Sequence, residues 1–164
     1  MITIRAFSES DWPSVWSILQ PVFKAAETYA FDPDMTEQEG YSTWIELPKA
    51  TYIAVDESES IVGTYYIKTN FQGPGSHVCN CGYVVSNQYR GKGVASAMCL
   101  HSQEQAPKLG YRSMQFNSVV STNMDAIHLW KKLGFQVIGT LPEVFNHPRY
   151  GYVDALVMFK KLVT

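Results

Sequence analysis

The stretch Tyr83-Val-Val-Ser-Asn-Gln-Tyr-Arg-Gly-Lys-Gly-Val-Ala-Ser96 decides the fold, because a strand, a glycine-rich turn and a helix follow one another in it. Gly91 and Gly93 carry no side chain that would keep a ligand from the main chain. The first N–H groups of a helix lack partners within the helix, and the helix dipole adds positive potential. Arg90 and Lys92 bring further positive charge. The stretch therefore predicts a phosphate or diphosphate site at the helix start.

Other interpretations of the same turn are weaker. A P-loop needs G-x-x-x-x-G-K-[ST], which this turn does not contain. A dinucleotide fingerprint needs a third glycine where the chain has Ser96, and it normally opens a fold rather than following antiparallel strands. A plain helix-start turn without a ligand stays open as an alternative.

The elements around this turn follow from hydrophobic periodicity, caps and turn residues. Ser10 is expected to cap the first helix, and Pro21 to kink or divide it. Thr36 and Glu39 form a capping-box pair for the second. Strands are expected at 3–7, 51–56, 61–69, 77–85, 113–120, 136–139 and 152–159, and helices at 11–24, 36–46, 94–108 and 123–133. This order predicts a mixed α/β sheet with one right-handed βαβ crossover and helices on its faces.

Composition limits the function further. The chain has 164 residues, 46% of them hydrophobic and 17% charged, which suits one globular domain over residues 1–164. A net charge of −2 argues against a general nucleic-acid-binding surface. No signal peptide or run of 18 apolar residues is found, so no membrane association is expected. Three cysteines at irregular spacing favour a reducing compartment and thus the cytoplasm.

The segment Gln88-x-x-Gly91-x-Gly93 resembles the [RQ]-x-x-G-x-[GA] motif of the GNAT superfamily, whose main-chain amides hold the pyrophosphate of coenzyme A (CoA). The later stretch Leu129-Trp-Lys-Lys-Leu-Gly-Phe135 is similar to the family's L-Y-x-K-x-G-F. The resemblance covers nearly the whole chain and is nearest to phosphinothricin-type enzymes that acetylate small amino acids. It implies a single GNAT-like α/β domain with a mostly antiparallel sheet, splayed central strands and helices on both faces.

The resemblance also assigns the co-substrate, acetyl-CoA, and the residues that bind it. Asn123 corresponds to an asparagine that bonds the pantetheine arm in many members, and it also suits the N-cap of the following helix. Both roles can hold together. The expected cofactor-binding residues are Val84, Val85, Gln88, Arg90, Gly91, Lys92, Gly93, Val94, Ala95 and Asn123.

The implied reaction is direct attack of a small amine or amino acid on the thioester, with the Val85 amide stabilising the oxyanion. Two residues depart from the family pattern. Asn80 stands where many members carry a glutamate base, and Trp130 where many carry a tyrosine acid. Asn cannot accept a proton at neutral pH, so Asn80 and Asn117 are expected to orient a water or the amine instead. The same departures keep an alternative open, a non-catalytic sensor that binds acyl-CoA.

Residues for the acceptor are expected on three segments. Asn117 either contacts the substrate or is buried, where it closes the gap between diverging strands. Asp154 binds the acceptor's ammonium or pairs with an arginine, and it shares a face with Tyr152. The expected substrate-binding residues are Glu27, Tyr29, Phe31, Asn117, Tyr152 and Asp154, although the segment carrying the first three also suits a solvated loop.

The remaining polar residues suggest no further chemistry. His77, Cys79 and Cys81 alternate along one strand, and same-face neighbours on a single strand close a tetrahedral metal site poorly, so no metal is expected. His147 is expected in an ordinary loop before the last strand, with an acceptor contact as the alternative. A homodimer is left open.

Overall fold

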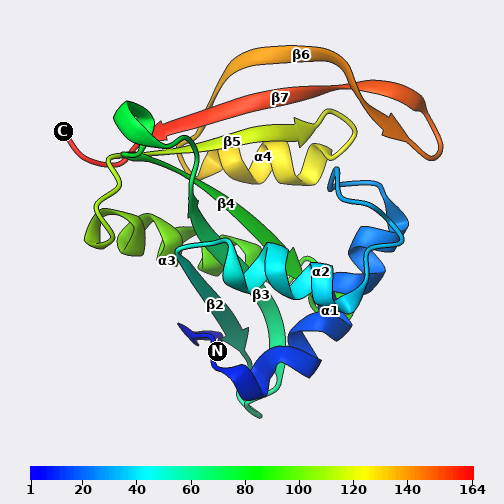
Figure 1. The fold of residues 1–164 in the computed structure, drawn as a ribbon, viewed down its shortest axis with the longest axis vertical. Helices are drawn as coiled ribbons and strands as arrows, with labels where there is room; N and C mark the ends of the chain where they lie inside the picture. The colour runs from blue at the N-terminus through cyan, green and yellow to red at the C-terminus, as the bar shows by residue number, and fades with distance from the viewer.

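The computed structural model describes all 164 residues as one seven-stranded sheet with helices on both faces (Figure 1). The helices are α1 (Trp12–Ala25), α2 (Glu37–Tyr41), α3 (Val94–Lys108) and α4 (Met124–Lys132). The strands are β1 (Thr3–Ala6), β2 (Ala50–Val55), β3 (Ile61–Thr69), β4 (Val78–Val85), β5 (Ser113–Val120), β6 (Gln136–His147) and β7 (Gly151–Lys161). This order of elements is the one predicted from the sequence, and it forms the expected mixed α/β sheet with helices on its faces.

The sheet runs in the order β1-β2-β3-β4-β5-β7-β6. Every neighbouring pair is antiparallel except β4 and β5, which are joined through α3 and pair in parallel. That parallel pairing covers only two positions, Val78 opposite Ser113 and Cys79 opposite Met114. Beyond them the two strands diverge, as Figure 1 shows for the ribbons labelled β4 and β5. The predicted splay of the central strands is therefore present.

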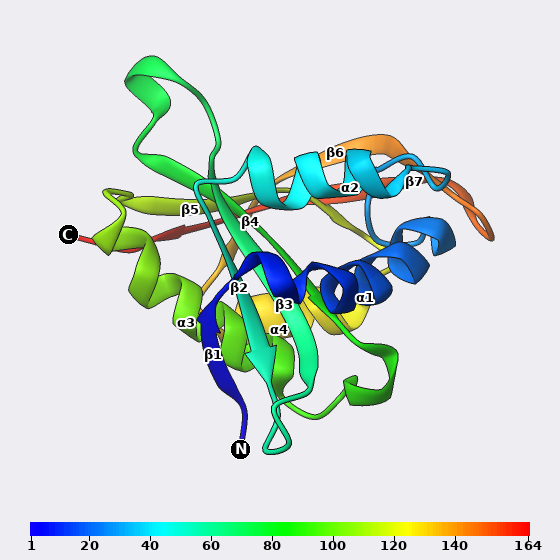
Figure 2. The same ribbon diagram turned by 60° about the horizontal axis from the view of Figure 1, so that its bottom comes forward.

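Two clusters of buried side chains lie on opposite faces of the sheet, because alternate residues of a strand point to opposite sides. One cluster packs α3 and α4 against the sheet, with Met98 and Cys81 among its members. The other packs α1 and the π-helix Ser42–Glu46, which continues α2, against β3 and β4, with Leu19 and Trp44 fully buried. Figure 2 shows α1 and α2 apart from α3 and α4 on the two sides of the central strands. The central strands are thus buried on both faces.

The start of α1 differs from the prediction. The cap is Ser8 rather than Ser10, since Ser8 and Asp11 form a capping box around a short 3-10 turn that precedes the helix. Pro21 does not divide the helix, which continues to Ala25. The carbonyl of Ser17, which loses its helical partner to the proline, lies on the exposed side, where water can satisfy it.

The predicted end of β6 at Gly139 is wrong. The strand continues to His147, so residues 145–147 belong to a long hairpin with β7 and not to a loop. A bulge between Leu141 and Phe145 accommodates Pro142 and the positive φ of 50° at Glu143. Asp154 Oδ1 accepts the N–H of Glu143 at 2.9 Å and holds this bulge. The hairpin therefore extends far enough to carry its turn toward the open end of β4 and β5.

None of the helices is both long enough and apolar enough to cross a membrane.

Candidate active site

The splay leaves one edge of β4 without a strand partner. Ser86 N–H bonds Val62 C=O, and Asn70 N–H bonds Val78 C=O, so the even-numbered residues of β4 direct their main-chain groups toward β3. The odd-numbered residues direct theirs toward β5. Because pairing with β5 ends at Cys79, the groups of Cys81, Tyr83 and Val85 face the gap. The Val85 amide, expected to stabilise the oxyanion, thus points into an opening between the strands.

A tyrosine from the loop between α1 and α2 reaches this edge. The hydroxyl of Tyr29 donates to the carbonyl of Tyr83 at 2.9 Å. The ring stacks on Phe31 with centroids 5.4 Å apart and meets Phe23 edge-on at 5.7 Å. Burial, with the nearby phenol of Tyr66, raises the pKa of Tyr29 well above its ordinary value. Of the predicted loop residues, Tyr29 and Phe31 are therefore half-buried and packed against α1, whereas Glu27 is exposed.

Asn80 lies where β4 and β5 begin to separate, on the face covered by α1. It is only 8% exposed, its Nδ2 donates to the carbonyl of Gln115 at 2.9 Å, and its Oδ1 accepts from the hydroxyl of Tyr66 at 3.5 Å. Asn80 is therefore the buried asparagine that bridges the diverging strands.

The sequence suggested that bridging role for Asn117, which is exposed instead. Asn117 Nδ2 donates to Asn70 Oδ1 at 2.7 Å, and Asn117 Oδ1 accepts from Gln115 Nε2 at 3.0 Å. The buried interpretation of Asn117 is wrong. The sequence left open whether Asn117 faces the core or the cleft, because strand alternation alone does not show how deeply a face is covered.

The glycine-rich turn has the geometry expected of an anion site. Gly91 and Gly93 have φ values of 75° and 83°, which disfavour other residues, and no atom lies within 4 Å of where a Cβ would stand. The first main-chain bond of α3 runs from Ala97 N–H to Gly93 C=O at 3.0 Å. The N–H groups of Val94, Ala95 and Ser96 therefore have no partner within the helix. Gln88, Arg90 and Lys92 are exposed beside them.

The turn is anchored to the hairpin between β2 and β3. Tyr89 donates its hydroxyl to Asp56 Oδ2 at 2.6 Å, and Lys92 Nζ lies 4.8 Å from the centre of the Tyr89 ring. The hydrogen bond from Tyr89, with others from Ser58 and Ser60, lowers the pKa of Asp56 to about 2. Asp56 is thus a carboxylate at neutral pH and holds the turn in place.

Helix α4 completes the far side of the gap. Asn123 caps it by accepting the N–H of Ala126 at 3.4 Å, so the predicted N-cap is confirmed. Trp130 is 8% exposed and packs against Tyr83 and Phe116 with centroids 5.1 and 5.3 Å apart. Its indole lies in the cluster under α3 and α4, across the sheet from Tyr29. Val84 is buried in the cluster under α1, and Val94 in the cluster under α3 and α4.

A cavity of about 220 Å³ lies where four segments meet. Its lining comes from the α1–α2 loop, the glycine-rich turn, the start of α4 and the turn after β6. The lining residues are Glu27, Thr28, Arg90, Thr122, Asn123, His147, Arg149 and Tyr150. Glu27 is therefore brought together with Arg90 and Asn123, which the sequence assigned to a different ligand.

The turn after β6 supplies the residues that sequence reasoning missed or misplaced. His147 is 5% exposed, and its Nδ1 accepts the main-chain N–H of Arg149 at 3.1 Å. Its Nε2 has no partner in the protein. Arg149 and Tyr150 were not predicted, because only the full length of β6 brings residues 147–150 to this place. Thr28 and Thr122 were missed although each adjoins a predicted residue, Tyr29 and Asn123.

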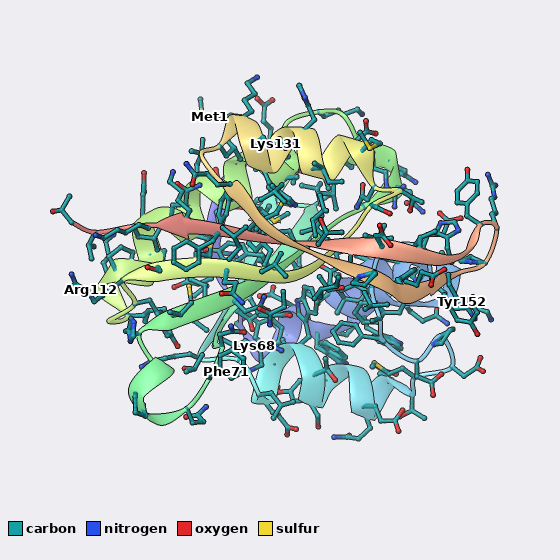
Figure 3. All side chains as sticks on the ribbon, turned by 90° about the horizontal axis from the view of Figure 1, so that it is seen from above. Met1, Lys68, Phe71, Arg112, Lys131 and Tyr152 are labelled. Atoms are coloured by element: carbon teal, nitrogen blue, oxygen red, sulfur yellow. The ribbon has the colours of Figure 1, made fainter.

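Two predicted acceptor residues lie away from this cavity. Asp154 holds the β6 bulge and pairs with no arginine. Tyr152 is 70% exposed, and Figure 3 shows it near the end of the β6–β7 pair. His77 is exposed ahead of β4, whereas Cys79 and Cys81 are buried in the strand.

These features, a splayed central strand pair that ends at a glycine-rich anion turn, define an acetyltransferase of the GNAT class. Residues 12–135 match the Acetyltransferase (GNAT) family, and the chain belongs to this family. It is 31% identical over 147 residues to N-acetyltransferase aca1 of Schizosaccharomyces pombe, which covers 80% of this chain and 70% of that protein.

Solved structures agree with this assignment. A GCN5-related N-acetyltransferase from Kribbella flavida superposes with a TM-score of 0.93 at 38% identity, over 98% of this chain and 97% of the other. A phosphinothricin acetyltransferase from Sinorhizobium meliloti, solved in complex with acetyl-CoA, has a TM-score of 0.86 at 20% identity. The match covers 99% of this chain and 89% of the other. At 20% identity, the similarity to the Sinorhizobium meliloti enzyme shows a shared fold only.

Proposed function

We propose that this acetyltransferase moves an acetyl group from acetyl-CoA to the nitrogen of a small amine or amino acid, by direct attack on the thioester. The observation that carries the proposal is the unpaired edge of β4, which ends at the glycine-rich turn. A ligand with an anionic head and an amide-containing arm matches both parts. The free N–H groups of Val94, Ala95 and Ser96 donate to the anionic head, and Arg90 and Lys92 lie beside it.

The arm is then assigned to the gap. The free N–H of Tyr83 and the free carbonyl of Val85 point there and pair with amides of the arm as a neighbouring strand would, while Tyr29 occupies the carbonyl of Tyr83. Asn123 borders both the cavity and the start of α4, which supports its predicted contact with the arm. The Val85 amide is proposed to bind the thioester oxygen and to stabilise the oxyanion that forms on attack.

The amine must lose a proton before it attacks, since primary amines are mostly protonated at neutral pH. No carboxylate or histidine contacts Asn80. We therefore assign Asn80 and Asn117 to positioning, with bulk or ordered water taking the proton. Asn80 keeps one amide hydrogen beyond the bond to Gln115, and Asn117 presents its amide on the same face.

The cavity supports a zwitterionic acceptor. Glu27 offers a carboxylate to an ammonium group, whereas Arg149 and the free Nε2 of His147 offer donors to a carboxylate. Tyr29 and Phe31 form an apolar wall next to this segment. A small amino acid carries the two charges that this lining separates.

The proposal is tested by measuring free CoA thiol released from acetyl-CoA with a panel of amino acids, polyamines and other amines. We expect release above background with at least one small amino acid. Tight binding of acetyl-CoA without release of CoA thiol across the panel would favour the alternative, a non-catalytic sensor. The lack of a carboxylate beside Asn80 is the observation that supports this alternative.

We further propose a cytoplasmic homodimer. All three cysteines are free and buried, as suits a reducing compartment.

The proposed dimer rests on strand β6, which is the last strand in the sheet. An edge strand with exposed apolar residues favours pairing with another copy. Those residues are Val137, Ile138, Leu141 and Val144. Sedimentation analysis of the purified chain tests the dimer, and a monomer at micromolar concentration would exclude it.

A further inference from the structure

Acetyl transfer needs a proton at the sulfur when the carbon–sulfur bond breaks. The chain has no obvious acid for this step. Trp130 has an indole N–H, which donates a hydrogen bond but does not act as an acid. It also packs under α3 and α4, on the side of the sheet away from the α1–α2 loop. A proton donor within the protein would therefore have to come from another element.

Tyr29 occupies the place from which such a proton can come. Its ring is contacted on three sides by Phe23, Phe31 and Trp44, whose ring centroids lie 5.7, 5.4 and 6.2 Å from that of Tyr29. The hydroxyl extends out of the cluster to the carbonyl of Tyr83 at 2.9 Å. A ring held in this way aims its hydroxyl in one direction, which is the preorganisation that proton transfer requires.

The carbonyl that Tyr29 contacts belongs to the unpaired edge of β4. Tyr83 and Val85 are two residues apart, about 7 Å along the strand, and their main-chain groups point the same way into the gap. The Val85 amide is the proposed donor to the thioester oxygen. The hydroxyl of Tyr29 therefore lies beside the proposed thioester site, on the side from which the α1–α2 loop approaches.

We propose that Tyr29 relays a proton from the attacking nitrogen to the CoA sulfur, an inference that rests on the proposed function. The nitrogen lone pair forms the new carbon–nitrogen bond, and the electron pair of the carbon–sulfur bond leaves with sulfur. Sulfur takes the phenol proton of Tyr29, and the Tyr29 oxygen takes a proton from the cationic nitrogen of the adduct. The products are the amide and the CoA thiol, and Tyr29 is regenerated.

The surroundings of the phenol favour a relay over a free acid. Burial raises the pKa of Tyr29, so a lone phenolate at this position is costly. The proton leaves the oxygen only as another arrives from the nitrogen. Tyr66, the other buried phenol on this face, donates to Asn80 and supports that asparagine instead.

The test compares the wild-type chain with Tyr29→Phe, which keeps the ring and removes the hydroxyl. Acetyl-CoA is the donor, and the nucleophiles are hydroxylamine, which is unprotonated at neutral pH, and any amine active in the thiol-release screen. We expect kcat to fall about 100-fold, the lower end for loss of a proton-transfer group. The KM for acetyl-CoA and the Kd for CoA should stay within about twofold. Tyr41→Phe, a surface change on α2, is the matched control.

A second measurement separates proton transfer from a merely structural role. The wild-type kcat should fall in D₂O, and Tyr29→Phe should show a smaller solvent isotope effect because the relayed proton is absent. Tyr29→Phe with wild-type kcat, or a parallel loss of kcat and CoA affinity, would overturn the relay and leave the proposed function intact. A wild-type chain that binds CoA but releases no thiol with any nucleophile would overturn the proposed function and the relay together.

Discussion

The side-chain amide of Asn80 donates to the main-chain carbonyl of Gln115 at 2.9 Å, and so joins β4 to β5 at the point where their ladder has ended. This bond replaces a missing main-chain pairing with a side chain. It fixes how widely the two strands open, and with it the width of the gap assigned to the pantetheine arm.

Replacing Asn80 with Ala should lower the free energy of unfolding by about 1–3 kcal/mol, because the carbonyl of Gln115 loses its partner in a covered position. Urea denaturation measures this change. The matched control is Asn117→Ala on the neighbouring strand, where the side chain is exposed and the change should stay within about 0.5 kcal/mol. Equal losses in the two variants would contradict the bridging role of Asn80.

Replacing Gly93 with Val should abolish most CoA affinity, because the φ of 83° disfavours a β-branched residue and the new side chain would enter the proposed pyrophosphate site. A tenfold or larger rise in Kd, about 1.4 kcal/mol, is expected by calorimetry. Gly110→Val is the control, since Gly110 ends the same helix with a φ of 96° and open space around it. It should lose stability without losing CoA affinity. Unchanged CoA binding in Gly93→Val would refute the assignment of this turn.

The ion pair between Arg5 and Asp11 should make stability depend on acid pH. Hydrogen bonds from Arg5 and Ser8 lower the pKa of Asp11 from 3.8 to about 2. A carboxyl whose pKa is depressed by folding stabilises the fold above its unfolded pKa and loses that contribution as pH falls toward its folded pKa.

Asp11→Asn should therefore be less stable than wild type at pH 7, and the difference should shrink as pH drops from about 4 to about 2. Urea denaturation across this range provides the measurement. Asp34→Asn serves as the control, because the Asp34 side chain makes no hydrogen bond. If the difference in free energy of unfolding between Asp11→Asn and wild type stayed constant with pH, the charge of the Asp11 carboxylate would contribute nothing to stability.

Arg149→Ala should raise the KM for acceptors that carry a carboxylate by about tenfold, the loss of one charge-assisted hydrogen bond. The KM for the decarboxylated amine of the same acceptor should not change. Steady-state kinetics with the matched pair of acceptors decides this. A similar effect on both would mean that Arg149 contacts CoA rather than the acceptor.

Much of the fold could be predicted because its signals are local. Gly91 and Gly93 lie in a turn that requires positive φ, and Thr36 with Glu39 closes the predicted capping box. Helix α3 and strands β3 and β5 have the predicted bounds. Each of these depends on residues within a few positions of one another.

The errors arose where distant residues decide the local structure. The sequence predicted that β6 ends at Gly139, yet the strand continues to His147, and Asp154 on the next strand satisfies the bulge around Glu143. That contact cannot be inferred from periodicity. The cavity lining shared by His147 and Arg149 followed from the same extension, so the missed length of β6 also hid part of the candidate site.

The unpaired edge of β4 has a consequence for how this enzyme can change over time. Its proposed contacts with CoA come from main-chain atoms, which no substitution removes as long as the strand keeps its path. The proposed contacts with the acceptor come instead from side chains on a loop and a hairpin turn. Mutation can therefore alter the choice of amine without loss of the co-substrate, so relatives with this backbone can differ widely in what they acetylate.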